Sequence, residues 1–319
     1  MLILQTFLFI FGFALLIKGG DFLVEGASAL AKSFRVSDLV IGLTVVSFGT
    51  SAPELLVNIY ASFSAAENIA FGNVLGSNVA NIFLVLGIAA ILRPLSLQWR
   101  TVWKEIPFAF IIVIVFAALA NDSFILEGDT NILSRLDGFI LLIFFSGFMY
   151  YSWDSMFDEE ILEELPQISR WKSSFMVFIG IVALGIGGKL VVDSASLIAE
   201  NVGISDAFIG LTIVAFGTSL PELVTSITAG LKQNSDIAVG NIVGSNIFNI
   251  AFVLGVSASI NPIPYALSFN TDVIFVLLAT ALLFGWMFVG EKYGINRIEG
   301  GIFFLIYVIY IFVLYNVYS

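Results

Sequence analysis

Long apolar runs, separated by short clusters of charged, glycine or proline residues, make up most of the chain. A membrane-spanning helix needs about 20 predominantly apolar residues, and ten runs come close to or exceed that length. They cover residues 2–18, 38–63, 69–92, 103–120, 137–152, 173–192, 206–230, 237–260, 271–290 and 298–317. The pattern predicts an all-α integral membrane protein with ten transmembrane helices.

Lysine and arginine residues are concentrated on one side of this ten-span arrangement. Eleven of the 13 lie on one side, and only Arg135 and Lys189 lie on the other. Because cytoplasmic loops are enriched in Lys and Arg, the richer side is assigned to the cytoplasm, and both termini are then extracytoplasmic. A miscounted span would scramble this bias, so the bias also supports the number ten.

The two halves of the chain repeat each other. Residues 36–87 align without a gap to residues 204–255 at an offset of 168, and 28 of the 52 positions are identical. The matching runs are IGLTVVSFGTSAPEL against IGLTIVAFGTSLPEL, and GNVLGSNVANI against GNIVGSNIFNI. Composition alone would align apolar letters, but it would not bring Gly, Thr, Ser, Pro, Glu and Asn into register, so the duplication is real.

Each repeat holds five spans, and an odd number inserts the second half upside down relative to the first. The expected units are an N-terminal five-helix repeat over 1–152, an acidic cytoplasmic linker over 153–172 and an inverted five-helix repeat over 173–319. Inverted repeats are a recurring plan of secondary transporters, with the binding site near the midplane between them. A channel or receptor does not need this symmetry, so transport is the better interpretation.

Composition narrows the chemistry further. Hydrophobic residues make up 59% of the 319 positions and charged residues 12%, with no cysteine and no histidine. This excludes disulfides, thiolate or imidazole metal sites and histidine proton relays. The net charge of −11 argues against nucleic acid as a partner. An intramembrane enzyme is not expected, because neither a suitable general base nor a metal-ligand triad accompanies the Glu, Ser and Asn residues.

Two acidic residues, Glu54 and its repeat copy Glu222, lie deep inside apolar spans. An unpaired carboxylate there costs several kcal/mol, and neither repeat core contains a Lys or Arg to pair with it. The partner must be a proton, the other carboxyl through a shared proton, or a bound cation. A protonated Glu hydrogen-bonded within a helix interface is the alternative, and it is less favoured for two residues related by symmetry.

Prolines precede both acids, at Pro53 and Pro221. A proline at 53 cannot donate to the carbonyl of Gly49, so the helix is predicted to break at residues 49–51 and to free main-chain carbonyls. Thr50 and Ser51 add hydroxyls at the same level. Hard cations such as Ca²⁺ take six to eight oxygens of these kinds. An ordinary proline kink, with the hydroxyls bonded back to the helix, is the less favoured alternative.

The following span contributes Ser77 and Asn81, four residues apart and therefore on one helix face. Their copies are Ser245 and Asn249. Interhelical hydrogen bonding is an alternative role for all four. For Asn73, Asn78, Asn241 and Asn246 the sequence leaves open whether they line an ion passage or only pin helices together. The glycines at 72, 76, 240 and 244 form small-xxx-small pairs, for which close helix packing is the expected role.

The paired G-T-S-x-P-E and G-S-N-x-x-N segments resemble the two signature repeats of the sodium/calcium exchanger family, prokaryotic type, within the cation/calcium antiporter superfamily. The resemblance implies four ion positions between the second, third, seventh and eighth spans. It implies side-chain oxygens from ten residues, which are Thr50, Ser51, Glu54, Ser77, Asn81, Thr218, Ser219, Glu222, Ser245 and Asn249. It also implies main-chain carbonyls at Ser47 and Ala215. Some members carry an aspartate at the position of Asn249, so this asparagine argues against potassium co-transport.

The expected function is exchange of Na⁺ for Ca²⁺ by alternating access, with no cofactor and no protein partner beyond the lipid bilayer. An empty site of charge −2 is too costly to carry across the barrier, whereas one Ca²⁺ or several Na⁺ neutralise it. The alternatives are a Ca²⁺/H⁺ antiporter and, from another class, a cation channel. The resemblance and the compact size imply a prokaryotic plasma (inner) membrane. The acidic stretch from Asp154 to Glu164 lacks the spacing of a Ca²⁺ loop and is expected to be a linker.

Overall fold

The computed structural model describes residues 2–64, 67–121, 131–154, 168–201, 217–289 and 292–318. Within these ranges, eight unbroken helices are long and apolar enough to cross a membrane, and a bent pair over 38–63 forms a ninth span. The predicted seventh span is described from residue 217 onward, and the acidic stretch after Asp154 lies outside the described residues. Apart from this seventh span, each predicted span corresponds to helical segments of the structure.

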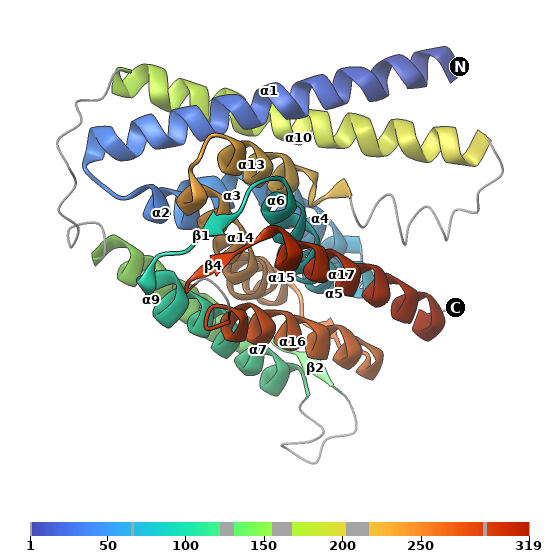
Figure 1. Ribbon diagram of the computed structural model, residues 1–319. Helices are drawn as coiled ribbons and strands as arrows, with labels where there is room; N and C mark the ends of the chain where they lie inside the picture. The colour runs from blue at the N-terminus through green and yellow to red at the C-terminus, as the bar shows by residue number, and fades with distance from the viewer. Residues whose placement is uncertain are drawn as a thin grey trace.

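The N-terminal repeat contains these elements in chain order (Figure 1): α1 Leu2–Phe34, α2 Asp38–Ile41, the π-helical turn η1 Gly42–Val46, α3 Ser47–Thr50, α4 Ala52–Ser64, α5 Glu67–Val79, the π-helical turn η2 Ala80–Leu86, α6 Gly87–Leu92, β1 Leu95–Ser96, the π-helical turn η3 Thr101–Glu105, α7 Ile106–Ala120, β2 Ile132–Leu133 and α9 Arg135–Asp154. Several π-helical turns continue directly into α-helices, so α5–η2–α6 forms one span.

The C-terminal repeat follows the same plan. Its elements are α10 Arg170–Asn201, α13 Leu220–Leu231, α14 Ser235–Ile247, the π-helical turn η6 Phe248–Val253, α15 Leu254–Ile260, β3 Ile263–Pro264, the 3₁₀ turn η7 Leu267–Phe269, α16 Asn270–Trp286, β4 Gly294–Ile295 and α17 Arg297–Tyr318. The turns η2 and η6 begin at positions 80 and 248, which keep the offset of 168 seen in the sequence.

The first and sixth spans are longer than the sequence predicted. The runs 2–18 and 173–192 were ended at polar and glycine clusters, whereas α1 continues to Phe34 and α10 covers Arg170–Asn201. The glycines in these clusters pack inside the α1–α10 interface. A Cβ added to Gly19 would lie 3.0 Å from the carbonyl oxygen of Gly180, so small residues here permit close approach and do not end the helix.

The equivalent helices α1 and α10 run antiparallel along each other (Figure 1). Gly12 contacts Gly187 near one end of the pair, and Gly26 contacts Ser173 near the other. Two equivalent helices can be antiparallel only if one repeat is inverted relative to the other. The inverted five-helix architecture is therefore confirmed.

Contacts between the repeats follow the same symmetry elsewhere. Strand β1 pairs with β4 and β2 pairs with β3, both antiparallel and each joining one repeat to the other. Gly87 of α6 packs against Gly300 of α17, and Gly255 of α15 packs against Gly138 of α9. The two halves therefore exchange equivalent contacts and do not form separate bundles.

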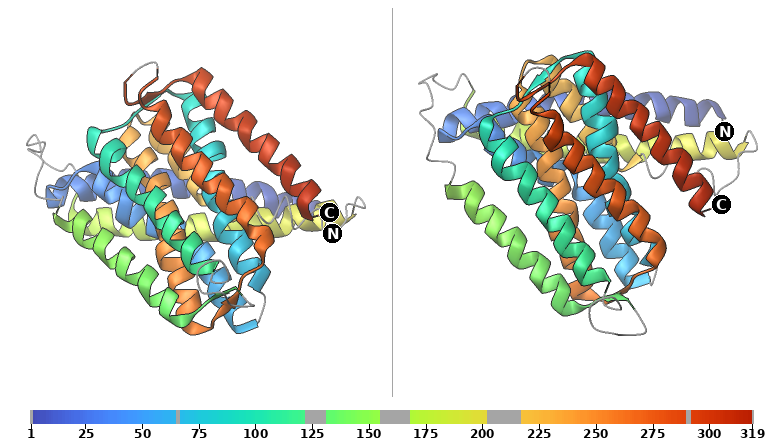
Figure 2. Two further views of the ribbon diagram at one scale, coloured as in Figure 1. Left: turned by 90° about the horizontal axis from the view of Figure 1, so that it is seen from below. Right: turned by 60° about the horizontal axis from the view of Figure 1, so that its bottom comes forward.

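The third and eighth spans form the centre of the molecule. In their apolar windows 83% and 94% of the residues are buried, against 22–39% in the windows of the other unbroken spans. The helix α7 lies between α9 and α16 on one side of this centre (Figure 2). The outer helices expose large apolar side chains such as Phe7, Ile143 and Phe312, as expected for surfaces that face lipid.

Candidate ion-binding site

The second span is broken where the sequence predicted. Helix α3 ends at Thr50, Ser51 adopts φ −84° and ψ 5°, and α4 begins at Ala52 with its axis bent by 46°. Ser219 precedes α13 with φ −86° and ψ 3°. These angles lie in the sparsely populated bridge region between helix and strand. The copies at Pro53 and Pro221 therefore produce the same local backbone in both repeats.

Glu54 and Glu222 lie in the first turns of the helices that follow these breaks, and both side chains are 0% exposed. In each carboxyl group Oε1 accepts hydrogen bonds, whereas Oε2 is buried and has no partner. No lysine or arginine in the described part of the chain forms an ion pair with either acid. Two buried carboxyl groups thus retain oxygens that are available to a bound cation.

Serine hydroxyls surround these carboxyl groups. Ser77 donates to Glu54 Oε1 at 3.4 Å, and its copy Ser245 donates to Glu222 Oε1 at 3.4 Å. Ser51 donates across the repeats to Glu222 Oε1 at 3.0 Å, whereas the buried hydroxyl of its copy Ser219 has no partner. The two half-sites contain the same residues but differ in this hydrogen bond.

The two threonines before the breaks are held by asparagines of the opposite repeat. Thr50 donates to Asn241 Oδ1 at 2.9 Å, and Thr218 donates to Asn73 Oδ1 at 3.3 Å. Each asparagine also donates to a main-chain carbonyl, Asn241 to that of Glu222 and Asn73 to that of Glu54, both at 3.4 Å. Asn73 and Asn241 therefore link the repeats, and both remain close to the acids.

The turns η2 and η6 carry Asn81 and Asn249 into the same region. Both side chains are 0% exposed, and the Oδ1 atom of each is buried without a partner. A π-helical turn inserts one residue into a helix and changes the direction of the residues that follow, and such turns are frequent at functional sites. The amide oxygens of Asn81 and Asn249 are available in the same way as those of the acids.

The structure brings together most of the residues predicted from the sequence. Ten predicted side-chain ligands lie in the described ranges: Thr50, Ser51, Glu54, Ser77, Asn81, Thr218, Ser219, Glu222, Ser245 and Asn249. The carbonyl of Ser47 accepts from the Ser51 N–H at 3.0 Å and from the Thr50 hydroxyl at 3.3 Å, so it is already a hydrogen-bond acceptor. Ala215 lies outside the described residues.

Two buried polar groups near the acids were not singled out from the sequence. Asn58 Oδ1 and Thr225 Oγ1 are buried without a partner, and both residues are 0% exposed. Asn58 follows Glu54 by four residues and donates from Nδ2 to the Glu54 carbonyl at 3.0 Å. Asn58 could have been identified from the sequence, because it follows an intramembrane acid by four residues and therefore lies on the same helix face.

The glycine prediction is confirmed in one repeat. A Cβ on Gly240 would lie 3.0 Å from the Leu39 carbonyl oxygen, and a Cβ on Gly244 would lie 2.6 Å from that of Leu43. These two glycines therefore allow α14 to pack directly on the broken second span. A Cβ added to Gly72 or Gly76 would have no neighbour within 4 Å among the described residues.

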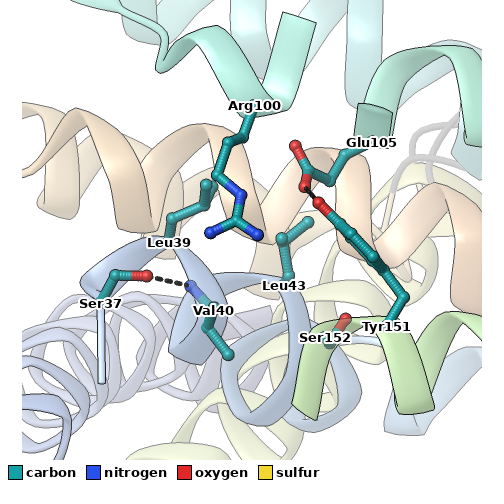
Figure 3. Close-up of a pocket in the computed structure, with 8 residues that line it drawn as sticks. All are labelled: Ser37, Leu39, Val40, Leu43, Arg100, Glu105, Tyr151 and Ser152. Carbon is teal, nitrogen blue, oxygen red and sulfur yellow. Dashed lines mark hydrogen bonds between the residues drawn. The ribbon is translucent and has the colours of Figure 1, made fainter. Parts of the chain in front are cut away.

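A separate small cavity, lined by both apolar and polar side chains, lies near the ends of α2, η3 and α9 (Figure 3). Its volume is about 10 Å³, which corresponds to a single water molecule. Glu105 accepts a hydrogen bond of 2.5 Å from the Tyr151 hydroxyl, and the Arg100 side chain also faces the cavity. One acid and one guanidinium balance in charge here, so this cavity lacks the negative charge that distinguishes the interior site.

Among the described residues, the interior site contains two acidic groups, Glu54 and Glu222. No cluster of three or more acidic side chains that could hold a metal occurs in the described ranges. A cation held here would therefore be coordinated by the two carboxylates together with neutral hydroxyl, amide and carbonyl oxygens. Oxygen-only ligand sets of this kind suit Na⁺ and Ca²⁺ rather than the softer transition metals.

An inverted-repeat membrane fold with a buried, oxygen-lined interior defines a transporter of ions, not an enzyme. The sodium/calcium exchanger protein model matches residues 4–153 and 172–316. The chain belongs to this family.

Individual relatives agree with this assignment. The chain is 31% identical to the sodium/calcium exchanger MaX1 of Methanosarcina acetivorans, over 99% of this chain and 100% of the relative. It is 36% identical to the inner membrane protein YrbG of Escherichia coli K12, over 87% and 89%. Its structure resembles that of the sodium-calcium exchanger NCX_Mj with a TM-score of 0.84, at 35% identity and with 97% and 98% of the two chains covered.

Proposed function

We propose that this protein exchanges Na⁺ for Ca²⁺ across the membrane by alternating access at the interior site. The observation that carries the proposal is the pair Glu54 and Glu222, both 0% exposed and each with an unpartnered carboxylate oxygen. Two carboxylates without cationic partners match the charge of one Ca²⁺. The names of MaX1 and NCX_Mj support the same pair of ions.

The neutral oxygens explain how Na⁺ can replace Ca²⁺. Two or more Na⁺ ions also cancel a charge of −2, but each needs its own ligand shell. The hydroxyls of Ser51, Ser77 and Ser245 supply such ligands beside the acids. An ion-free site with both carboxylates ionised carries a charge of −2 in a low-dielectric interior, which disfavours passage between inward and outward forms. Loading by one ion type or the other is then required for each passage, and this requirement is antiport.

The site residues are assigned as the sequence predicted. Glu54 and Glu222 bind Ca²⁺ directly, together with the amide oxygens of Asn81 and Asn249. The hydroxyls of threonine and serine complete the Na⁺ positions, with Asn58 as an additional candidate from the structure. We assign the protein to the plasma (inner) membrane, with the lysine- and arginine-rich side in the cytoplasm and both termini outside.

Radiolabelled Ca²⁺ uptake into proteoliposomes tests the function. The vesicles are loaded with Na⁺, diluted into Na⁺-free or Na⁺-containing buffer, and held at fixed pH and membrane voltage with ionophores. Exchange predicts uptake only with an outward Na⁺ gradient. Uptake that ignores Na⁺ and follows an imposed proton gradient would identify a Ca²⁺/H⁺ antiporter. Uptake that follows the Ca²⁺ gradient alone, without a counter-ion, would identify a channel.

A further inference from the structure

Asn78 and Asn246 form a reciprocal bridge between the two central helices. Asn78 Nδ2 donates to the main-chain carbonyl of Asn246 at 3.0 Å, and Asn246 Nδ2 donates to that of Asn78 at 3.2 Å. Both side chains are buried, with 0% and 4% exposure. The two residues are repeat copies at the offset of 168, so the bridge lies on the pseudo-twofold axis that relates the repeats.

The bridge fixes the orientation of the side-chain amides of Asn78 and Asn246. A main-chain carbonyl only accepts hydrogen bonds, so the atom of Asn78 next to it must be the NH₂ group. The remaining Oδ1 atom of Asn78 accepts from Asn249 Nδ2 at 3.0 Å. The NH₂ group of Asn249 is therefore used in this hydrogen bond, and the unpartnered buried side-chain atom of Asn249 must be the oxygen Oδ1.

An equivalent set of hydrogen bonds orients Asn81 through Asn246. Asn246 Oδ1 accepts from Asn81 Nδ2 at 3.0 Å, which leaves Asn81 Oδ1 buried without a partner. Each ligand asparagine is thus oriented by an asparagine of the other repeat. Both orientations rest on main-chain carbonyl acceptors, and a flip of either ligand amide would place two oxygens against each other.

We infer that Asn78 and Asn246 are positioning residues that fix the side-chain amides of Asn249 and Asn81 with oxygen, not nitrogen, toward the cation. An amide whose NH₂ group faces a cation repels it, so the orientation determines whether the asparagine is a ligand at all. The sequence left open whether these asparagines line an ion passage or pin helices. The inference goes beyond the proposed function and rests on it only for the identity of the ion.

Rescue by aspartate tests the inference. A carboxylate presents oxygen on both sides and needs no orienting partner, so Asn249→Asp should make the bridge residue opposite it dispensable. Asn78→Ala alone should raise the Kd for Ca²⁺ by about 10- to 100-fold, the usual effect of removing a group that orients a metal ligand. In the Asn249→Asp background the same substitution should no longer weaken Ca²⁺ binding by more than about twofold.

The second bridge residue supplies a crossed control. Asn246→Ala should be rescued by Asn81→Asp and not by Asn249→Asp, and the reverse holds for Asn78→Ala. This crossed pattern separates orientation from a general gain of negative charge, which would help every combination equally. Where an alanine variant is not recovered folded, Asn78→Ser gives the same comparison, because serine is too short to reach Asn249 while bonded to the opposite helix.

A matched asparagine bridge lies away from the site. Asn121 and Asn270 exchange amide hydrogen bonds at 3.0 and 2.9 Å and also join the two repeats. Asn121→Ala should lower the thermal unfolding temperature without changing the Kd for Ca²⁺. If Asn78→Ala behaves in the same way, with a lower unfolding temperature, an unchanged Kd and no coupling to position 249, the bridge is a structural brace and the inference is wrong.

Ca²⁺ binding and Ca²⁺ transport are measured in separate assays. The Kd comes from Ca²⁺-dependent thermal shifts of purified protein in detergent, and exchange comes from uptake into proteoliposomes. A wild type that binds Ca²⁺ but shows no Na⁺-driven uptake would overturn the proposed exchange and leave the orientation test intact. A wild type that shows no Ca²⁺-dependent shift would overturn both.

Discussion

Replacement of Glu54 or Glu222 by glutamine should weaken Ca²⁺ binding and stabilise the ion-free protein at the same time. Both side chains are 0% exposed, and each has one carboxylate oxygen without a hydrogen-bond partner. Glutamine keeps the shape and removes the charge. The ion-free site loses a buried charge that has no cationic partner, which is costly inside a membrane. The ion-bound site loses half of the charge that attracts Ca²⁺.

The size of the effect follows from this burial. Removal of one partner from a buried charge pair costs about 3–5 kcal/mol, which corresponds to a Kd roughly 100- to 4,000-fold weaker. At a Ca²⁺ concentration of 100 times the wild-type Kd, bound ion stabilises the wild type by about 2.7 kcal/mol. After a 100-fold loss of affinity the same concentration adds only about 0.4 kcal/mol.

Thermal unfolding in detergent measures both effects in one experiment, with tryptophan fluorescence recorded in Ca²⁺ and in chelator. We expect a higher unfolding temperature in chelator for Glu54→Gln and Glu222→Gln than for the wild type, and almost no shift on addition of Ca²⁺. Glu105→Gln is the matched control, because Glu105 is an intramembrane acid only 2% exposed that hydrogen-bonds Tyr151 outside the interior site. It should keep the wild-type Ca²⁺ shift. A full Ca²⁺ shift and normal uptake in both site variants would refute the assignment of the two acids.

Three further experiments test separate parts of the structure. Ser51→Ala removes a 3.0 Å hydrogen bond to a buried carboxylate. We expect the Na⁺ concentration for half-maximal exchange to rise about fivefold or more, with a smaller change in the corresponding Ca²⁺ concentration. Equal changes for both ions would contradict a role specific to Na⁺. Gly244→Ala places a Cβ 2.6 Å from a main-chain oxygen and should destabilise the protein by about 1–3 kcal/mol. In the control Gly147→Ala the new Cβ has no neighbour within 4 Å, so this substitution should leave the thermal unfolding temperature unchanged or raise it. Because the chain has no cysteine, a cysteine introduced by Lys292→Cys or by Ser268→Cys can be labelled selectively with an impermeant maleimide. Only the Ser268→Cys variant should react from outside intact cells, and the opposite pattern would reverse the proposed orientation.

The features that the sequence predicted correctly depend on local covalent geometry or on repetition. Proline removes a hydrogen-bond donor wherever it stands in a helix, so the break before Pro53 was predictable and is found at Ser51. The gapless alignment predicted inverted halves, and the antiparallel pair α1 and α10 confirms them. A carboxyl group in an apolar span has few explanations, so Glu54 and Glu222 were recognisable without coordinates.

Other features depend on contacts between distant segments, which helical spacing does not encode. Gly19 was interpreted as the end of a span because glycine and charge coincide there, yet it packs against Gly180 inside a continuous helix. Helical spacing placed Asn81 on the face of Ser77 but could not indicate that its NH₂ group is held by Asn246 of the other repeat. The partner in such a bond is 165 residues away in sequence, and only the packing of the repeats brings it close.

Identical residues in the two half-sites nevertheless form different bonds. Ser51 bonds Glu222, whereas its copy Ser219 does not bond Glu54. Since the residues are the same, the mirrored arrangement has the same chemistry, and the inverted topology turns it toward the opposite face of the membrane. Two arrangements of nearly equal energy that face opposite sides are what alternating access requires. The bonds of Ser51, Thr50 and Asn81 all cross between repeats, so a shift of one repeat against the other changes the ligands and the access together.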